Sequence, residues 1–193
     1  MNVTLKTGGI AAARFLTAFA VALWIGGMTF FGAVAAPVLF SEARKEGVPT
    51  IAPVMVGLML GRFSFVTFAC SGILLLAWGI EAKLLKPRAG AKRWFMIQGA
   101  GTVICVLLGV YLGVVLLPQT QAAQSVVLPI FNKKEHHQPL SPDEAGIMAK
   151  FEAGHQTYEL LAEVNLWLGV ALLALVSARA TYFPVESEQA GMS

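Results

Sequence analysis

The stretch from Phe15 to Phe40 contains no charged side chain. An α-helix rises about 1.5 Å per residue, so this stretch would be roughly 39 Å long and could cross about 30 Å of hydrocarbon with some tilt. Backbone amides inside hydrocarbon must form hydrogen bonds within their own segment. The stretch must therefore be helical, although it contains Gly26, Gly27 and Pro37, which would weaken a helix in water. It predicts a membrane span at about residues 15–40.

Small and aromatic residues in this span predict how it packs. Ala18, Ala22 and Gly26 recur every four residues and form one small face, which would let a partner helix approach closely. Trp24 lies too deep for the membrane interface, so its indole N–H needs a partner inside the bundle. Pro37 lies near the outer end, where a missing amide and a kink cost least. Packing alone explains these residues, and we assign them structural roles.

A cleaved signal peptide is the alternative interpretation of the N-terminal part. Lys6 and Arg14 precede an apolar stretch that contains the small residues Ala33-Val34-Ala35. The apolar stretch is too long for a signal peptide, and Pro37 lies awkwardly near the cleavage point. We therefore interpret the stretch as a retained span.

The whole chain has the composition of a membrane protein. Of its 193 residues, 56% are hydrophobic and only 13% are charged, about half the charged share of an average soluble domain. We expect one domain at residues 1–183, followed by a disordered tail at residues 184–193 that has nothing to bury. Basic residues cluster beside apolar stretches, which indicates the lipid bilayer as a partner and argues against nucleic acid.

The apolar stretches and the charges between them predict an all-α fold, an integral membrane four-helix bundle. The expected spans cover about residues 15–40, 51–80, 94–117 and 157–178. The segment 81–94 carries five basic residues against the single acid Glu81, and basic loops stay in the cytoplasm. This pattern predicts a multi-pass protein of the cell inner membrane with both termini cytoplasmic.

The last helix is predicted to be longer than the bilayer. Ser141 caps its start, Pro142 suits its first turn, and Glu144 completes a capping box. The helical pattern then continues to about Ala178, as one helix or two nearly collinear ones. Its first half should stand outside the membrane or lie on its surface. The preceding residues 118–140 are polar and predict a loop.

Charged residues on the last helix form one stripe. Glu152, His155, Glu159 and Glu163 are spaced by three, four and four residues, and so they share one helix face. Arg62 is the only charge within the second span. Counted from the inner ends of their spans, Arg62 lies at roughly 28 Å, Glu159 at roughly 30 Å and Glu163 at roughly 24 Å. The matching levels predict an Arg62–Glu159 or Arg62–Glu163 ion pair near the outer surface.

Two interpretations of this stripe stay open. It could be a structural ion pair, or a set of side chains that reach up to the interface. It could instead line an outward-facing polar pocket for a small ligand, a proton or a metal ion. His155 and Glu159 lie at i and i+4 and could ligate one cation, but a catalytic zinc site has three protein ligands. We therefore predict no metal site and no cofactor.

The sulfur-containing residues are better explained by packing than by chemistry. Cys70 and Cys105 lie inside apolar stretches without a CxxC partner and should be buried, unreactive thiols. Met55 and Met59 share a helix face, where core filling is favoured over a thioether path for copper.

Two neutral polar residues lie within the spans. Gln98 and Asn165 should each form a hydrogen bond with another helix, which favours a role in helix packing over a functional role. The sequence contains no GxSxG, P-loop or HExxH motif. No motif in the sequence indicates an enzyme, and no catalytic residue is predicted.

The residues Trp24-Ile25-Gly26-Gly27, Phe30-Phe31 and Ala36-Pro37-Val38-Leu39-Phe40 resemble the first helix of the bacterial relatives of transmembrane protein 205, which form domain-of-unknown-function family 4149. Phe151-xxx-His155, before a span that contains Asn165, is similar to the ending of that family. Copper-resistance D-type proteins share a Trp-x-Gly-Gly first helix but usually have more histidines in the membrane. The resemblance implies a four-span membrane protein with no established reaction, and it supplies no catalytic residues.

The sequence therefore favours a non-enzymatic membrane protein with a small outward-facing pocket, which assists transport or forms part of a complex. The alternative is a membrane-embedded redox or metal-handling component for copper or haem. Glycine-rich faces on three spans leave room for a homo-oligomer, although one bundle could use them all. The identity of a ligand is not predicted.

Overall fold

The computed structural model describes residues 3–84 and 89–182, with side chains described for residues 6–84 and 92–179. Within these ranges every regular element is a helix, and the helices join into four long rods. Each rod is long and apolar enough to cross a membrane. The structure confirms the predicted all-α, four-helix fold. The predicted tail at residues 184–193 lies outside the described residues.

Two of the rods contain a short π-helical turn, and two are single α-helices. The elements are α1 (Val3–Phe30), the π-helical turn η1 (Phe31–Ala35), α2 (Ala36–Lys45), α3 (Ile51–Leu84), α4 (Ala89–Tyr111), the π-helical turn η2 (Leu112–Leu116), α5 (Leu117–Glu135) and α6 (Pro142–Tyr182). The first rod consists of α1, η1 and α2, the second of α3, the third of α4, η2 and α5, and the fourth of α6.

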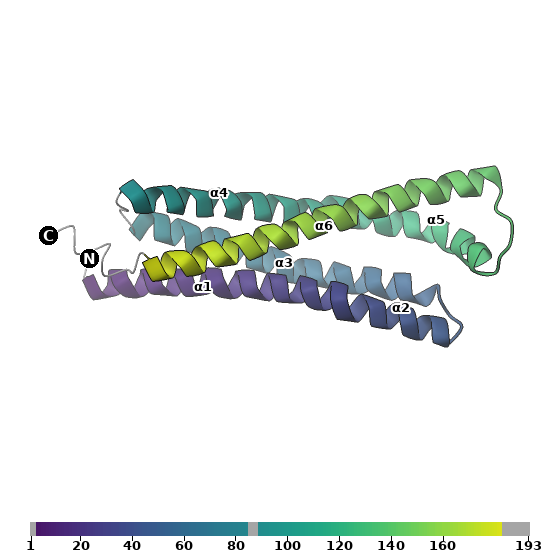
Figure 1. Cartoon of the computed structure of the whole chain (residues 1–193), viewed down its shortest axis with the longest axis horizontal. Helices are drawn as coiled ribbons and strands as arrows, with labels where there is room; N and C mark the ends of the chain where they lie inside the picture. Colours follow the sequence, from purple (N-terminus) through teal and green to yellow (C-terminus); the bar gives the residue numbers. More distant parts are fainter. Residues whose placement is uncertain (1–2, 85–88, 183–193) are drawn as a thin grey trace.

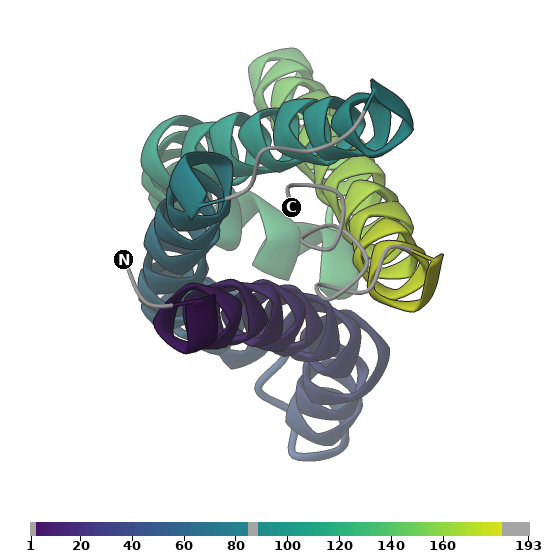
Figure 2. The same cartoon turned by 90° about the vertical axis from the view of Figure 1, so that its left-hand side faces the viewer.

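The four rods run antiparallel along one axis (Figure 1). The start of α1, the end of α3, the start of α4 and the end of α6 lie at one end of the bundle, which we call the terminal end. The connections from α2 to α3 and from α5 to α6 lie at the other end, the loop end. Seen from the terminal end, the rods form a ring in the order α1, α3, α4, α6 (Figure 2). Both α1 and α4 pack on α3 and on α6, so α3 and α6 occupy opposite corners.

The third rod continues through Pro118, which corrects the prediction of a loop at residues 118–140. Helix α5 extends to Glu135, so most of that segment is helical. Proline cannot donate a backbone hydrogen bond, and its ring crowds the carbonyl group four residues earlier. The π-helical turn η2 makes room for the ring, because the Leu117 N–H donates to the more distant Leu112 oxygen. The helix therefore passes the proline instead of ending there.

The first rod shows the same arrangement at Pro37. There the Ala36 N–H donates to the Phe31 oxygen, and the helix goes on to Lys45. Each π-helical turn ends two residues before its proline and overlaps a Gly-x-Val-x-x-Pro segment, at residues 32–37 and 113–118. The first rod is therefore longer than the span predicted at residues 15–40.

Helix α6 is one uninterrupted helix of 41 residues, the first of the two forms that the sequence predicted. Its capping box is formed: the Ser141 N–H donates to Glu144 Oε2 at 2.9 Å, and the Glu144 N–H donates to Ser141 Oγ at 3.2 Å. A helix of 41 residues is roughly 60 Å long, about twice the hydrocarbon thickness of a bilayer. Helix α6 is therefore longer than a bilayer crossing requires.

Glycines on the rods receive aromatic rings from their neighbours. A Cβ atom added at Gly109 would lie 2.6 Å from Trp24 Cζ2, so only glycine leaves room for the ring. The same relation joins Gly27 with Phe63, Gly99 with Trp78, and Gly113 with Phe68. Trp24 is buried, and its indole N–H donates to the Met28 sulfur at 3.1 Å, a partner on its own helix. The rods are thus held together by rings seated in glycine gaps.

The small face predicted on α1 is not used in this way. Ala22 and Gly26 are exposed, and a Cβ atom added at Gly26 would meet nothing within 4 Å. Within the described residues no helix packs over Gly26. The Ala22–Gly26 face of α1 is therefore not used for close packing between the four rods.

Replacing Gly109 and Gly26 by alanine tests the role of the glycine gaps. Gly109→Ala should lower the free energy of unfolding by about 1–3 kcal/mol, because the new methyl group forces the Trp24 ring to move. Gly26→Ala is the matched control and should be neutral or raise stability by about 0.5–1 kcal/mol through helix propensity. Thermal unfolding of both variants in detergent, followed by circular dichroism, measures the difference. A Gly109→Ala protein as stable as Gly26→Ala would contradict the packing described above.

Candidate functional site

One polar side chain from each rod meets at the terminal end of the bundle. Arg14 comes from α1, Glu81 from α3, Gln98 from α4 and Arg179 from α6. Glu81 is 1% exposed and Arg179 3% exposed, although both carry charge. We call these four residues the terminal-end network. Buried charges of this kind are tolerated only when they are paired and hydrogen-bonded.

Both oxygens of the Glu81 carboxylate are engaged. Arg14 Nε donates to Oε1 at 2.9 Å, and Arg179 Nη1 donates to Oε2 at 3.0 Å. Arg179 Nη2 also lies 2.9 Å from Oε1, a close contact between charges without an aligned hydrogen bond. The carboxylate therefore links α3 to both α1 and α6.

Arg179 extends the network to the fourth rod. Its Nη1 also donates to Gln98 Oε1 at 2.9 Å, and its guanidinium group lies 4.9 Å from the centre of the Phe95 ring. A guanidinium over an aromatic face is attracted by the ring electrons. The Arg179 Nε has no hydrogen-bond partner among the described residues. Charge, amide and ring together fix the position of this buried cation.

Sequence reasoning missed this network, although it noted most of its members. It noted Arg14 only as a basic residue before the first apolar stretch, and Glu81 only as the single acid of a basic segment. It expected Gln98 to bond another helix, and Gln98 accepts from Arg179 of α6. The available signal was one polar residue at the same end of each of four spans, because antiparallel packing brings those ends to one level.

A second polar contact lies near the middle of the bundle. Asn165 is buried, and its Oδ1 accepts a hydrogen bond from Cys105 Sγ at 3.1 Å. The side chains of Trp24 and Met28 border the same gap, which is too narrow to admit a water molecule. Both cysteines of the chain are free and buried. This contact joins α4 to α6 and leaves no space for a ligand.

The predicted pair between Arg62 and Glu159 or Glu163 is not formed. All three side chains are exposed, and within the described ranges no ion pair joins Arg62 to a carboxylate. The levels match, but α3 and α6 stand at opposite corners of the ring (Figure 2). Counting residues along two spans gives their relative heights and not which spans are neighbours.

The other members of the stripe make local contacts on the outside of α6. His155 Nε2 lies 3.1 Å from Glu159 Oε1, and the two side chains are 50% and 63% exposed. The Phe151 ring stacks on the His155 ring at 6.0 Å, and Lys134 Nζ approaches Glu152 at 3.3 Å. In residues 3–84 and 89–182 no three His, Cys, Asp or Glu side chains gather as metal ligands. Three members of the stripe thus make exposed local pairs, whereas Glu163 is exposed and forms no ion pair among these residues.

A family assignment follows from comparison with known sequences. Residues 19–126, more than half of the 193 residues, match the family described as Domain of unknown function (DUF4149). The chain belongs to this family. No curated protein and no solved structure matches it. The part that matches DUF4149 contains Glu81 and Gln98, whereas Arg14 and Arg179 lie on either side of it. Because the family has no assigned activity, any function must be inferred from the geometry.

Glu81→Gln tests how much the terminal-end network contributes to the free energy of unfolding. The variant keeps the shape of the side chain but leaves two guanidinium groups without their shared anion, and we expect a loss of about 3–5 kcal/mol in the free energy of unfolding. The control is Glu42→Gln in the exposed Lys45–Glu42 pair, which should cost less than about 1 kcal/mol. Thermal unfolding in detergent measures both variants. Equal stabilities would mean that the buried network does not hold the rods.

Proposed function

We propose that this DUF4149 protein is a non-enzymatic, complex-forming component of the bacterial inner membrane, with both termini in the cytoplasm. The exposed bases Lys83, Lys92 and Arg93 at the terminal end support this orientation, because basic segments remain on the cytoplasmic side. A relationship to transmembrane protein 205 is part of the proposal and rests on the resemblance of residues 24–40.

The length of the rods carries the proposal. They contain 34 to 44 residues, which corresponds to roughly 50–65 Å of helix, whereas about 20 residues suffice to cross the hydrocarbon. On α4 and η2 the exposed large apolar side chains extend from Trp94 to Val115, roughly 31 Å. From Pro118 onward the exposed residues of α5 are polar or small except for Val126. We therefore place the membrane around the terminal half and the loop half outside it.

In the loop half α5 contacts both α6 and α3, and Gln121 Nε2 of α5 donates to the Gly57 oxygen of α3 at 2.7 Å. The start of α6 packs on α5 through Val127, Ile130 and Met148, and α2 packs on α3. A groove of about 500 Å³ opens between the start of α3 and the middle of α5. It is lined by Thr50, Ile51, Val54, Ser125, Leu128, Pro129 and Asn132. The groove is open to the outside, and its walls combine apolar side chains with a few polar groups.

The occupant that we propose for this groove is an apolar segment of a partner protein. Ile51 and Val54 are exposed although this part of α3 lies outside the hydrocarbon in our placement, and exposed apolar side chains in water favour association. Ser125 and Asn132 at the groove supply hydrogen-bonding groups for a peptide backbone. The groove replaces the predicted pocket around His155 as the site of binding.

Photo-crosslinking in native membranes tests this function. A benzophenone amino acid at Ser125 should yield one protein adduct of defined mass. The groove-filling Val54→Trp should abolish that adduct, whereas Val126→Trp, an exposed position outside the groove lining, should leave it unchanged. Adducts with phospholipid alone, or an adduct that does not respond to Val54→Trp, would contradict the proposal. A haem absorbance band or stoichiometric copper in the purified protein would favour a redox role instead.

A further inference from the structure

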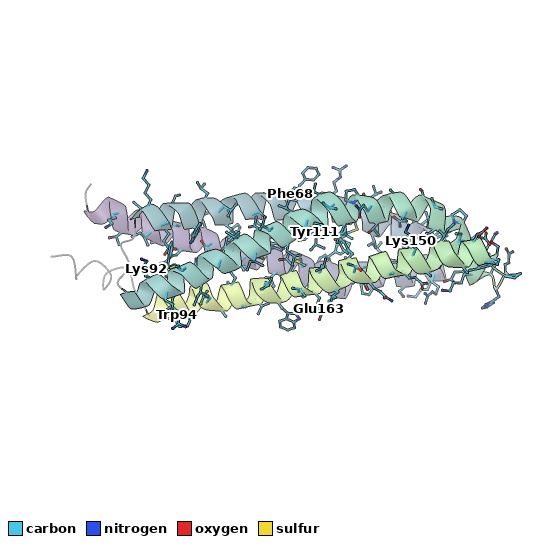
Figure 3. The ribbon with its side chains drawn as sticks, turned by 90° about the horizontal axis from the view of Figure 1, so that it is seen from above. Phe68, Lys92, Trp94, Tyr111, Lys150 and Glu163 are labelled. Carbon is cyan, nitrogen blue, oxygen red and sulfur yellow. The ribbon has the colours of Figure 1, made fainter. Side chains whose placement is uncertain are left out.

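Two charged side chains stand on the outer surface of the membrane half. Arg62 lies on α3 and Glu163 on α6, both are exposed, and neither forms an ion pair within the described residues. Figure 3 shows Glu163 about midway along the bundle on the outer side of α6, between Trp94 and Lys150. In our placement both charges stand at the outer edge of the hydrocarbon, where a charge is usually paired with another charge or with water. A base and an acid exposed at that level can pair across a contact between two molecules.

The two charges lie at nearly the same height in the membrane. Arg62 is nineteen residues before Glu81, and Glu163 is sixteen residues before Arg179. Because Arg179 Nη1 donates to Glu81 Oε2 at 3.0 Å, both counts start from residues that are in contact at the terminal end. The heights are about 28 Å and about 24 Å, a difference smaller than one helical turn. Glu159 is at a similar height but already pairs with His155.

Each charge is surrounded by exposed apolar side chains on its own helix. Phe65, one turn from Arg62, is 70% exposed, and Trp167, one turn from Glu163, is 63% exposed. Leu58 and Leu160 lie one turn away in the other direction and are also exposed. Both faces thus present an aromatic ring, a charge and a leucine in the same vertical order. An aromatic ring beside an arginine adds cation–π attraction to an ion pair.

We propose that α3 of one copy packs against α6 of a second copy, with Arg62 paired to Glu163 across the contact. Within one molecule the two helices stand at opposite corners of the ring, so only another molecule can bring them together (Figure 2). Two copies in the same membrane share one orientation, and so the matching heights are preserved between them. The partner of this surface is a second copy of the chain.

The contact joins two different faces, which determines the kind of assembly. Each copy offers α3 to one neighbour and α6 to the other, so the copies form a ring if the rotation closes or a row if it does not. A twofold pair built on α3 alone would place Arg62 against Arg62, and like charges would repel. The inference concerns the membrane half and does not depend on a partner in the loop-half groove.

Cysteine crosslinking in native membranes tests the contact. In a background with Cys70→Ala and Cys105→Ala, the double variant Phe65→Cys/Trp167→Cys should give dimers and higher species with a short bis-maleimide reagent. The matched control places the cysteines at Phe19 and Ile104, two exposed positions on α1 and α4, and should give none of these species. Absence of crosslinked species from the first pair, or equal yields from the two pairs, would overturn the proposal.

Charge reversal tests the ion pair within that assay. Arg62→Glu and Glu163→Arg should each reduce the crosslinked fraction several-fold, and Arg62→Glu combined with Glu163→Arg should restore it. Because both side chains are exposed, the single variants should unfold at the temperature of the parent protein, which shows that they fold. Crosslinking that survives both single reversals, or that the double reversal fails to restore, would show that the charges do not hold the contact.

Discussion

The Glu81 carboxylate holds the terminal end of this protein together. It accepts hydrogen bonds from Arg14 of α1 and Arg179 of α6, and Arg179 in turn donates to Gln98 of α4. A slide of one rod by one helical turn is about 5.4 Å, enough to break these contacts and leave charge buried without a partner. The network therefore fixes the relative height of all four rods, and the heights of every other side chain follow from it.

Above this level the rods are fixed by shape. Rings such as those of Trp24 and Trp78 occupy the space that a Cβ atom would take at Gly109 and Gly99. A ring fits only where its glycine faces it, so this packing fixes the rotation of each rod about its own axis. The ionic contacts fix the height of each rod along the bundle. Towards the loop end α6 packs on α5, α2 packs on α3, and α5 also contacts α3, where a groove opens between them. The molecule thus has a tightly fixed base and a more open, exposed end.

Much of this fold could be predicted from the sequence, because its strongest signal is chemical. Long uncharged stretches must be helical in lipid, and the capping box at Ser141 gave the start of α6. The prediction of a loop after Pro118 was wrong. A proline usually predicts the end of a helix, but here a π-helical turn accommodates it, and such a turn has no simple sequence signal.

The candidate site could be predicted only in part. Residue counts gave the heights of Arg62 and Glu163 but not the order of the rods around the ring, so the sequence paired side chains that stand at opposite corners. Arg14, Glu81 and Arg179 looked like ordinary charges at span ends, because their burial depends on where the other three rods stand. Which spans become neighbours depends on how the whole chain packs, and the sequence of a single span does not determine it.

The π-helical turns also change the direction in which a rod faces. Each turn takes up one residue more than an α-helical turn, and so every later side chain is rotated by about 100° relative to an unbroken helix. Along the first rod, α1 packs on both α3 and α6, whereas beyond η1 the continuing helix α2 packs on α3. The extra residue turns α2 relative to α1 without a break in the axis of the rod. The same rod thereby continues from the ring that contains α1 to a helix, α2, that lies against α3 with no buried residue of its own.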